Sequence, residues 1–519
     1  MTLSGSPNCS STAARIFTAA LSSLRGRRGW VSFWGCGGDY PSGIASDHDL
    51  SERINPNAIL AVLALAGIAF AVLSSAVLPA LPTIQRSLHV SETDVGWLLT
   101  GFLLSASVGT SIIGRLGDMY GKERLLLVTL GVLAVGVLLA AIAHSLILLI
   151  TARVIQGIGG GIFPLAFAII RDEFPADRVP GSIGLLSSML GVGGGVGVVV
   201  GALIVEHLSW HWLFWIPLAL TLLAAACTWW FVPESPIRVP GRVNWIAAML
   251  MSAGVCCSLI AIAQTTTWGW ISAKTLGLLL AGLAIIAVWI LFEVRSKEPL
   301  IDMAMMRIRG VWTTNLAAFL LGAGMYSSFL LYPQFAQLPK STGFGYGASV
   351  VASGLYLLPG AAAMGLLGSA AGRVARRFGS KPAMLTGTAI TAFSFALFAV
   401  ANSHPYDMLI ASALLGIGIG LAFAALGNLI VGAVPPEQTG VATGMNTVLR
   451  TLGGAVGAQI AATVIASHTA HGLPTLTGYR IVFLMATGFL VVCVLAGALV
   501  PGGSARLATR GLKPAEETG

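Results

Sequence analysis

Gly114-Arg115-Leu116-Gly117-Asp118-Met119-Tyr120-Gly121-Lys122-Glu123-Arg124 is the stretch that decides the fold. It places five charged residues between two apolar runs, residues 102–113 and 125–143. Its glycines let the backbone turn and approach a neighbour where a Cβ would obstruct. So short a connection predicts two antiparallel helices joined at one side of a membrane.

The composition supports a membrane protein. Of 519 residues, 56% are hydrophobic and only 9% are charged. A bilayer-spanning helix needs roughly 20 apolar residues, and runs of that length follow one another from Pro56 onward. We therefore predict an all-α membrane protein with fourteen spans, near residues 56–79, 94–114, 124–143, 146–170, 181–205, 211–232, 243–265, 273–295, 311–336, 347–371, 382–402, 406–430, 438–466 and 480–501.

The positive charge is distributed unevenly between the connections. The net charge is +9, and 23 of the 29 Lys and Arg residues fall in segments on one side of the predicted spans. This asymmetry follows the positive-inside rule and argues against a nucleic-acid partner. It predicts a multi-pass protein of the inner (plasma) membrane with both termini in the cytoplasm.

The chain repeats itself. Gly114, Arg115 and Gly121 recur 258 residues later as Gly372, Arg373 and Gly379, and glycines of the fourth and fifth spans recur at almost the same spacing. The repeat predicts two parallel six-helix halves with two inserted helices, as in secondary transporters. The expected segments are a disordered cytoplasmic tail (1–55), a first half (56–232), an insert with linkers (233–309), a second half (310–501) and a C-terminal tail (502–519).

Three motifs carry a resemblance to a known family. They are Gly114-x-x-x-Asp118-x-x-Gly121-Lys122, Arg153-x-x-Gln156-Gly157, and the glycines at 193, 197 and 201. The chain resembles the major facilitator superfamily, in its fourteen-helix drug:proton antiporter branch. The resemblance implies a cytoplasmic gate held shut by contacts between the Asp of the loop, nearby Arg residues and a helix end of the other half. The gate residues it implies are Gly114, Arg115, Asp118, Gly121, Lys122, Arg373, Arg376 and Gly379.

The repeat of the gate motif is imperfect. Arg376 stands where the second copy of Asp118 would fall, so any latch is asymmetric.

Several polar residues lie within the spans. An Arg inside a span must face a cavity or a partner, and Arg153 either lines the cavity or donates to backbone carbonyls of a neighbouring helix. The polar residues of the second half either line the cavity or bond one helix to another. The expected cavity set is Arg153, Gln156, Asn315, Tyr326, Asn446 and Arg450, and the expected packing set is Gly157, Gly193, Gly197 and Gly201.

The first span departs from the branch that the chain resembles. Where that branch carries an Asp, residues 73–76 read Leu-Ser-Ser-Ala, and no Asp or Glu lies in the middle of a predicted span. Coupling to protons is therefore implied by the resemblance alone.

The resulting prediction is a secondary active exporter of amphipathic, drug-like molecules that works by alternating access as a monomer. Protons and the lipid bilayer are its other partners, and the proton gradient replaces any bound cofactor. The alternatives are an exporter of lipid or metabolite on the same fold, and a non-transporting receptor or scaffold. The sequence shows no nucleophile motif, metal-ligand spacing or phosphate-binding loop, so no enzyme activity is expected.

Overall fold

The computed structural model describes residues 55–235, 244–296, 298–470 and 473–501. The side chains of 92–93, 266 and 326–330 are not among those described. The predicted tails, 1–55 and 502–519, lie outside this part of the chain except for Asn55. The described residues all belong to the compact unit that begins at Ile54.

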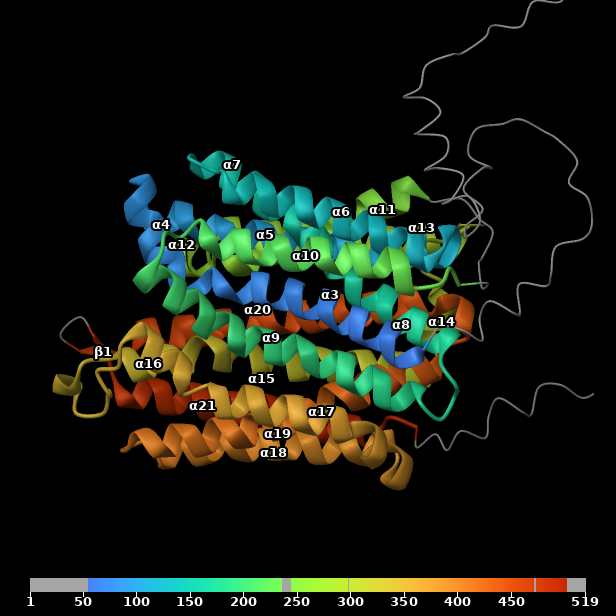
Figure 1. Cartoon of the computed structure of the whole chain (residues 1–519). Coiled ribbons are helices and arrows are strands. Elements are labelled where there is room, and N and C mark those ends of the chain that lie inside the picture. The colour runs from blue at the N-terminus through green and yellow to red at the C-terminus, as the bar shows by residue number, and fades with distance from the viewer. Residues whose placement is uncertain (1–54, 236–243, 297, 471–472, 502–519) are drawn as a thin grey trace, which may run out of the picture. The chain divides into compact units, whose positions relative to one another are not determined.

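Long helices follow one another through both halves (Figure 1). The first half contains α3 (Pro56–Ala76), η2 (Leu78–Ala80), α4 (Leu81–Leu88), α5 (Glu92–Tyr120), α6 (Lys122–Ala141), α7 (Leu146–Gly157), η3 (Ile158–Gly161), α8 (Ile162–Glu173), α9 (Val179–His207) and α10 (Trp212–Phe231). The insert contains α11 (Trp245–Ala263), α12 (Thr265–Trp268), α13 (Ala273–Arg295) and α14 (Met303–Arg307). The second half contains α15 (Arg309–Gln337), η4 (Lys340–Thr342), α16 (Val350–Leu355), α17 (Leu358–Phe378), α18 (Ser380–Val400), α19 (Pro405–Ala433), η5 (Pro436–Gln438), α20 (Thr439–Ser467), β1 (Thr469–Ala470), β2 (Leu473–Pro474) and α21 (Leu476–Gly497).

The all-α membrane fold is confirmed. Thirteen helices of the described residues are long and apolar enough to cross a membrane. Helix α15 occupies the ninth predicted span and is 29 residues long, but it is outside this set. The predicted count of fourteen spans is therefore approximate.

Residues 114–124, which the sequence suggested as a turn, are almost entirely helical. Helix α5 continues through Gly114, Gly117 and Asp118 to Tyr120, and Gly121 alone connects it to α6 with φ +109°. The second copy is built alike, with Gly379 at φ +88° between α17 and α18. Of the three glycines, Gly121 forms the turn in a conformation that a Cβ disfavours, whereas Gly114 and Gly117 lie inside α5, where a Cβ would overlap Gly440 and Leu165.

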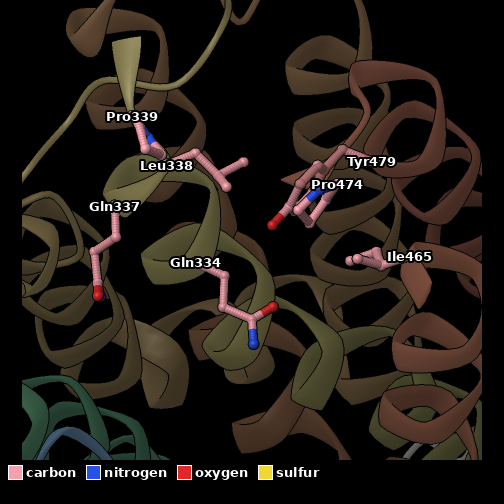
Figure 2. Close-up of a pocket in the computed structure, with 7 residues that line it drawn as sticks. All are labelled: Gln334, Gln337, Leu338, Pro339, Ile465, Pro474 and Tyr479. Carbon is pink, nitrogen blue, oxygen red and sulfur yellow. The ribbon is translucent and has the colours of Figure 1, made fainter. Parts of the chain in front are cut away.

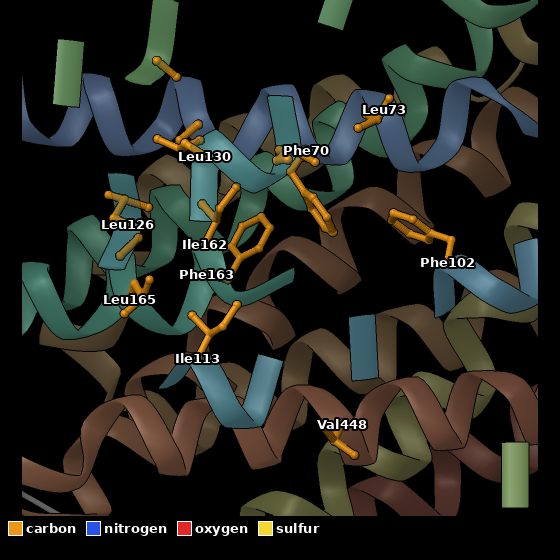
Figure 3. Packing of buried hydrophobic residues seen from close by; sticks show 14 of the residues in the cluster. Phe70, Leu73, Phe102, Ile113, Leu126, Leu130, Ile162, Phe163, Leu165 and Val448 are labelled. Atoms are coloured by element: carbon orange, nitrogen blue, oxygen red, sulfur yellow. The ribbon is translucent and has the colours of Figure 1, made fainter. Parts of the chain in front are cut away.

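Two clusters of buried apolar side chains form the interior. One lies in the first half and extends to the insert and to parts of α15, α19 and α20, and the other lies in the second half. Figure 3 shows part of the first cluster, where Phe70, Phe102 and Phe163 lie near one another and Val448 of α20 lies at its edge. Aromatic rings stack directly here, since the Phe70 and Phe102 centroids are 5.6 Å apart.

Two helix pairs make the most extensive contacts between the halves. We call the contact of α5 with α20 the first seam and the contact of α9 with α17 the second seam. Helix α11 of the insert packs on α13 and also on both helices of the first seam. The insert therefore lies along one junction between the halves.

Glycines set the close approach of helices within each half. A Cβ on Gly457 of α20 would overlap the carbonyl oxygen of Ala323 in α15. Small residues of this kind let helix backbones pack closely in a membrane, where the hydrophobic effect gives no drive for association.

We expect Gly457→Val to lower the melting temperature of the purified protein by several degrees or to abolish its folded yield. Gly131→Val is the matched control, because a Cβ at Gly131 in α6 meets nothing within 4 Å. Thermal unfolding of both variants in detergent checks this expectation, and equal melting temperatures would contradict it.

Candidate functional site

Charged residues gather at one end of the helix bundle, the end that contains the turns at Gly121 and Gly379. We call it the charged end. Asp118 lies there, near the end of α5, and is only 1% exposed. Its carboxylate accepts hydrogen bonds from the backbone N–H groups of Gly440 at 3.4 Å and Val441 at 3.2 Å. These groups belong to the first turn of α20 in the other half, a helix without a side-chain N-cap of its own. A carboxylate at this position satisfies unpaired N–H donors and complements the helix dipole.

The backbones meet beside Asp118. A Cβ on Gly114 would overlap the carbonyl oxygen of Gly440, and a Cβ on Gly372 would overlap Gly181 Cα in the second seam. Gly372 is the repeat of Gly114, and Gly440 is the repeat of Gly181. The two seams are therefore equivalent crossings of the duplicated chain, and both are closed at the charged end.

A second contact between the halves was not predicted from the sequence. Arg171, two residues before the end of α8, donates to the carbonyl oxygens of Val434 at 2.7 Å and Pro435 at 3.4 Å. It also donates to the Thr439 hydroxyl at 2.8 Å. Val434 is the C-cap of α19, so a cation meets the negative end of one helix while Asp118 meets the positive end of the next. The only signal in the sequence was a charge at the end of a span.

The second seam is bonded differently. Arg376, the counterpart of Asp118, donates to the carbonyl oxygen of Asp177 at 3.1 Å, just before α9 begins. Asn428 of α19 donates to the Pro180 carbonyl at 3.1 Å. At the equivalent positions of the repeat, Asp118 thus accepts from N–H groups of the other half, whereas Arg376 donates to a carbonyl of the other half.

Lys122 acts within its own half. It forms a fully buried ion pair with Asp172 of α8, and Ser235 donates to the same carboxylate. Arg124 Nε lies 3.2 Å from Glu234 Oε2. Burying an ion pair costs desolvation, so such a pair fixes geometry more than it adds stability. The pair of Lys122 and Asp172 holds the start of α6 against the end of α8, and the pair of Arg124 and Glu234 holds it against the segment that follows α10. No spacing or motif in the sequence singles out Asp172 or Glu234 as the partners.

The remaining predicted gate residues make fewer contacts. Arg115 is half-buried and Arg373 is exposed, and neither forms a hydrogen bond with another described residue. Gly121 lies against the Glu234 carboxylate, where a Cβ would be 2.5 Å from Oε1.

Arg153 is fully buried, and its Nε and Nη1 groups donate to two backbone carbonyls and one side chain, while Nη2 has no hydrogen-bond partner among the described residues. Nε donates to the Leu98 carbonyl at 3.2 Å and Nη1 to the Leu73 carbonyl at 3.4 Å and to Gln156 Oε1 at 2.9 Å. Gln156 then donates to the Gly136 carbonyl at 2.9 Å, and the Arg153 guanidinium lies 4.1 Å from the Phe102 ring centroid. Arg153 therefore joins α3, α5 and α7, as in the alternative of carbonyl bonding. A role in the cavity stays a prediction.

The polar residues of the second half also bond helix to helix. Asn446 Nδ2 donates to Asn315 Oδ1 at 2.9 Å, which ties α20 to α15. The Arg450 guanidinium lies 4.7 Å from the ring centroid of Phe423 in α19. The side chain of Tyr326 lies outside those that the structure describes.

The predicted packing glycines lie at helix crossings. A Cβ on Gly157 would overlap Ser105 of α5. Gly193, Gly197 and Gly201 lie in the same way against α3.

Comparison with known proteins is consistent with this architecture. The model of the Major Facilitator Superfamily matches residues 63–458 and 361–515. The tetracenomycin C resistance and export protein of Streptomyces glaucescens is 28% identical over 84% of this chain and 81% of its own length. Multidrug resistance protein 3 of Bacillus subtilis is 28% identical over 71% of this chain and 72% of its own length.

Solved structures share the fold. The human organic anion transporter MFSD10 superposes with a TM-score of 0.63 at 17% identity, covering 86% of this chain and 100% of its own. The proton:xylose symporter XylE gives a TM-score of 0.62 at 15% identity, covering 87% and 97%.

Arg153→Lys should destabilise the protein by about 1–3 kcal/mol. The guanidinium of Arg153 donates to Leu73, Leu98 and Gln156 at once. A single lysine ammonium cannot reproduce this geometry, so buried carbonyls lose their hydrogen-bond donor. Arg450→Lys is the control, since that side chain is only half-buried. Denaturant unfolding measures the difference, and a loss no larger than that of Arg450→Lys would contradict the assigned geometry.

Asp118→Asn and Arg171→Gln should each loosen the charged end. Removing either charge weakens a helix-end contact by about 1 kcal/mol, or roughly fivefold in the population of the closed end. Spin labels at Tyr120 and Phe378, in a background without cysteine, report the distance between the halves.

Asp94→Asn and Arg178→Gln are the matched controls, because both side chains are exposed and contact only their own half. A distance distribution that stays as in the parent protein for both test variants would refute the closure.

Proposed function

The chain belongs to the major facilitator superfamily, and we propose that it exports amphipathic, drug-like molecules by alternating access. The observation that carries this proposal is the closure at the charged end. Glycine crossings and helix-end contacts join two equivalent halves there. Such contacts can separate as two rigid bodies rock, without unfolding either half. Asp118 and Arg171 are the proposed latch of the first seam, and Arg376 is the proposed contact of the second.

The relatives support the kind of cargo. Their names assign tetracenomycin C export to one and multidrug resistance to another. We assign this chain a similar cargo of drug-like molecules. The named relatives also favour export over a function as a receptor or scaffold.

The positions of the acids narrow the cargo further. Every described Asp and Glu lies within three residues of a helix end or between helices. The described middle of the spans therefore holds no carboxylate to pair with a cation. This observation favours neutral cargo, and it keeps export of lipid or a neutral metabolite as the second candidate.

The proposed energy source is the proton gradient, and no cofactor is part of the proposal. Moving one charge across 100 mV yields about 2.3 kcal/mol. We place the protein as a monomer in the inner (plasma) membrane with both termini, and hence the charged end, in the cytoplasm. The excess of Lys and Arg in the connections at that end supports the orientation.

Efflux of ethidium and of chloramphenicol from proteoliposomes, with and without a pH gradient, tests the proposal. We expect export of chloramphenicol to exceed that of ethidium and to stop when the gradient is collapsed. Asp118→Asn should slow export several-fold, whereas Asp94→Asn should not. Export that continues after collapse of the gradient would exclude proton coupling, and export of neither compound would refute drug export.

A further inference from the structure

A cavity of about 340 Å³ lies at the end of the second half opposite the charged end. It is formed by the last turn of α15, the end of α20, β2 and the start of α21 (Figure 2). We propose that it binds uncharged ring compounds bearing hydroxyl or carbonyl groups, through the Tyr479 hydroxyl and the Gln334 amide. None of the predicted cavity residues lines it.

Tyr479 is a fixed donor without a protein partner. The residue is only 2% exposed, and its ring packs edge-to-face on Phe335 with centroids 5.2 Å apart. Phe344 and Phe483 lie around it with centroids at 6.2 Å. Its hydroxyl forms no hydrogen bond with any described residue, and Figure 2 shows it pointing into the space between α15 and α21. Aromatic packing therefore orients the hydroxyl in advance of binding.

Gln334 offers the second polar group. Its amide also has no hydrogen-bond partner among the described residues. It extends toward the same space as the Tyr479 hydroxyl (Figure 2). Gln337, one turn on, is already bonded to the Ser353 hydroxyl at 3.0 Å. The Tyr479 hydroxyl and the Gln334 amide can thus each form a hydrogen bond with a hydroxyl or carbonyl group of one ligand.

The rim of the cavity is built into the fold. The Leu338 carbonyl accepts a hydrogen bond from the Gly347 N–H at 2.8 Å. On the other side, Pro474 lies in the hairpin of β1 and β2, where Thr469 pairs with Pro474. The Thr475 hydroxyl closes this hairpin by donating to the His468 carbonyl at 3.0 Å.

The lining defines the class of ligand. Leu338, Ile465 and the two prolines give apolar walls, and none of the seven lining residues is charged. The lining therefore offers no counter-charge to a cation or an anion. The volume is at the lower end of the range for small-molecule sites. A compact neutral ring compound satisfies these limits.

The position gives the site a role. It lies at the end through which export would release cargo, so we assign it as a release subsite. This role rests on the proposed export function, whereas binding itself does not.

Binding of radiolabelled chloramphenicol to the purified full chain in detergent tests the site without a gradient or turnover. The double variant Gln334→Leu with Tyr479→Phe should weaken binding about tenfold, because two hydrogen bonds are lost while the apolar walls remain. Ile465→Trp should fill the cavity and abolish binding. Gln85→Leu, at the corresponding end of the first half, should bind as the parent does, and the melting temperature shows that each variant is folded.

Three results would overturn the proposal: no saturable binding of chloramphenicol, binding unchanged in the double variant, or an equal loss of ethidium binding. Displacement of the labelled chloramphenicol by a neutral diacylglycerol at far lower concentration than by unlabelled chloramphenicol would assign the cavity to lipid and also overturn the proposal. Retained binding without efflux in vesicles would count against export and not against the site.

Discussion

Helix α20 begins without a side-chain cap of its own, and closure of the charged end depends on that deficit. Ser or Thr residues cap the helices α5, α7, α13, α16 and α21, each of which begins at the opposite end. At the charged end, two N–H groups of α20, those of Gly440 and Val441, donate to Asp118 of the other half. Unpaired backbone groups are costly away from water. When the halves separate, α20 therefore needs another acceptor, and water entering the opened gap supplies it.

The duplication explains why so much of this end could be predicted. Glycine spacing in the sequence revealed the duplication, and the structure then shows glycines where the backbones cross in both seams. Asp118 was recognised because it belongs to a motif of fixed spacing. Arg171 and Glu234 have no such spacing, and their partners lie far along the chain or in the other half. A charge at a span end is common, and only the fold shows which helix end it reaches.

The prediction was weakest in the middle of the spans. A buried Arg or Asn can line a cavity or bond a neighbouring helix, and both uses place the same residue type in the same span. Arg153 and Asn446 donate to groups on adjacent helices, which stiffens each half. Rigid halves suit a mechanism in which motion is confined to the junction. The unpartnered polar groups near Tyr479 could not be foreseen, because they depend on how three helix ends meet.

Because of the position of the insert, the two seams differ in how far they are exposed to the lipid. Helix α11 packs on both α5 and α20, so the first seam is shielded by protein along that contact. A molecule dissolved in the bilayer that approaches on this side meets the insert before it meets the gap between the halves. The two extra helices thus act as a wall against lateral entry, and they direct any membrane-dissolved cargo to the rest of the perimeter.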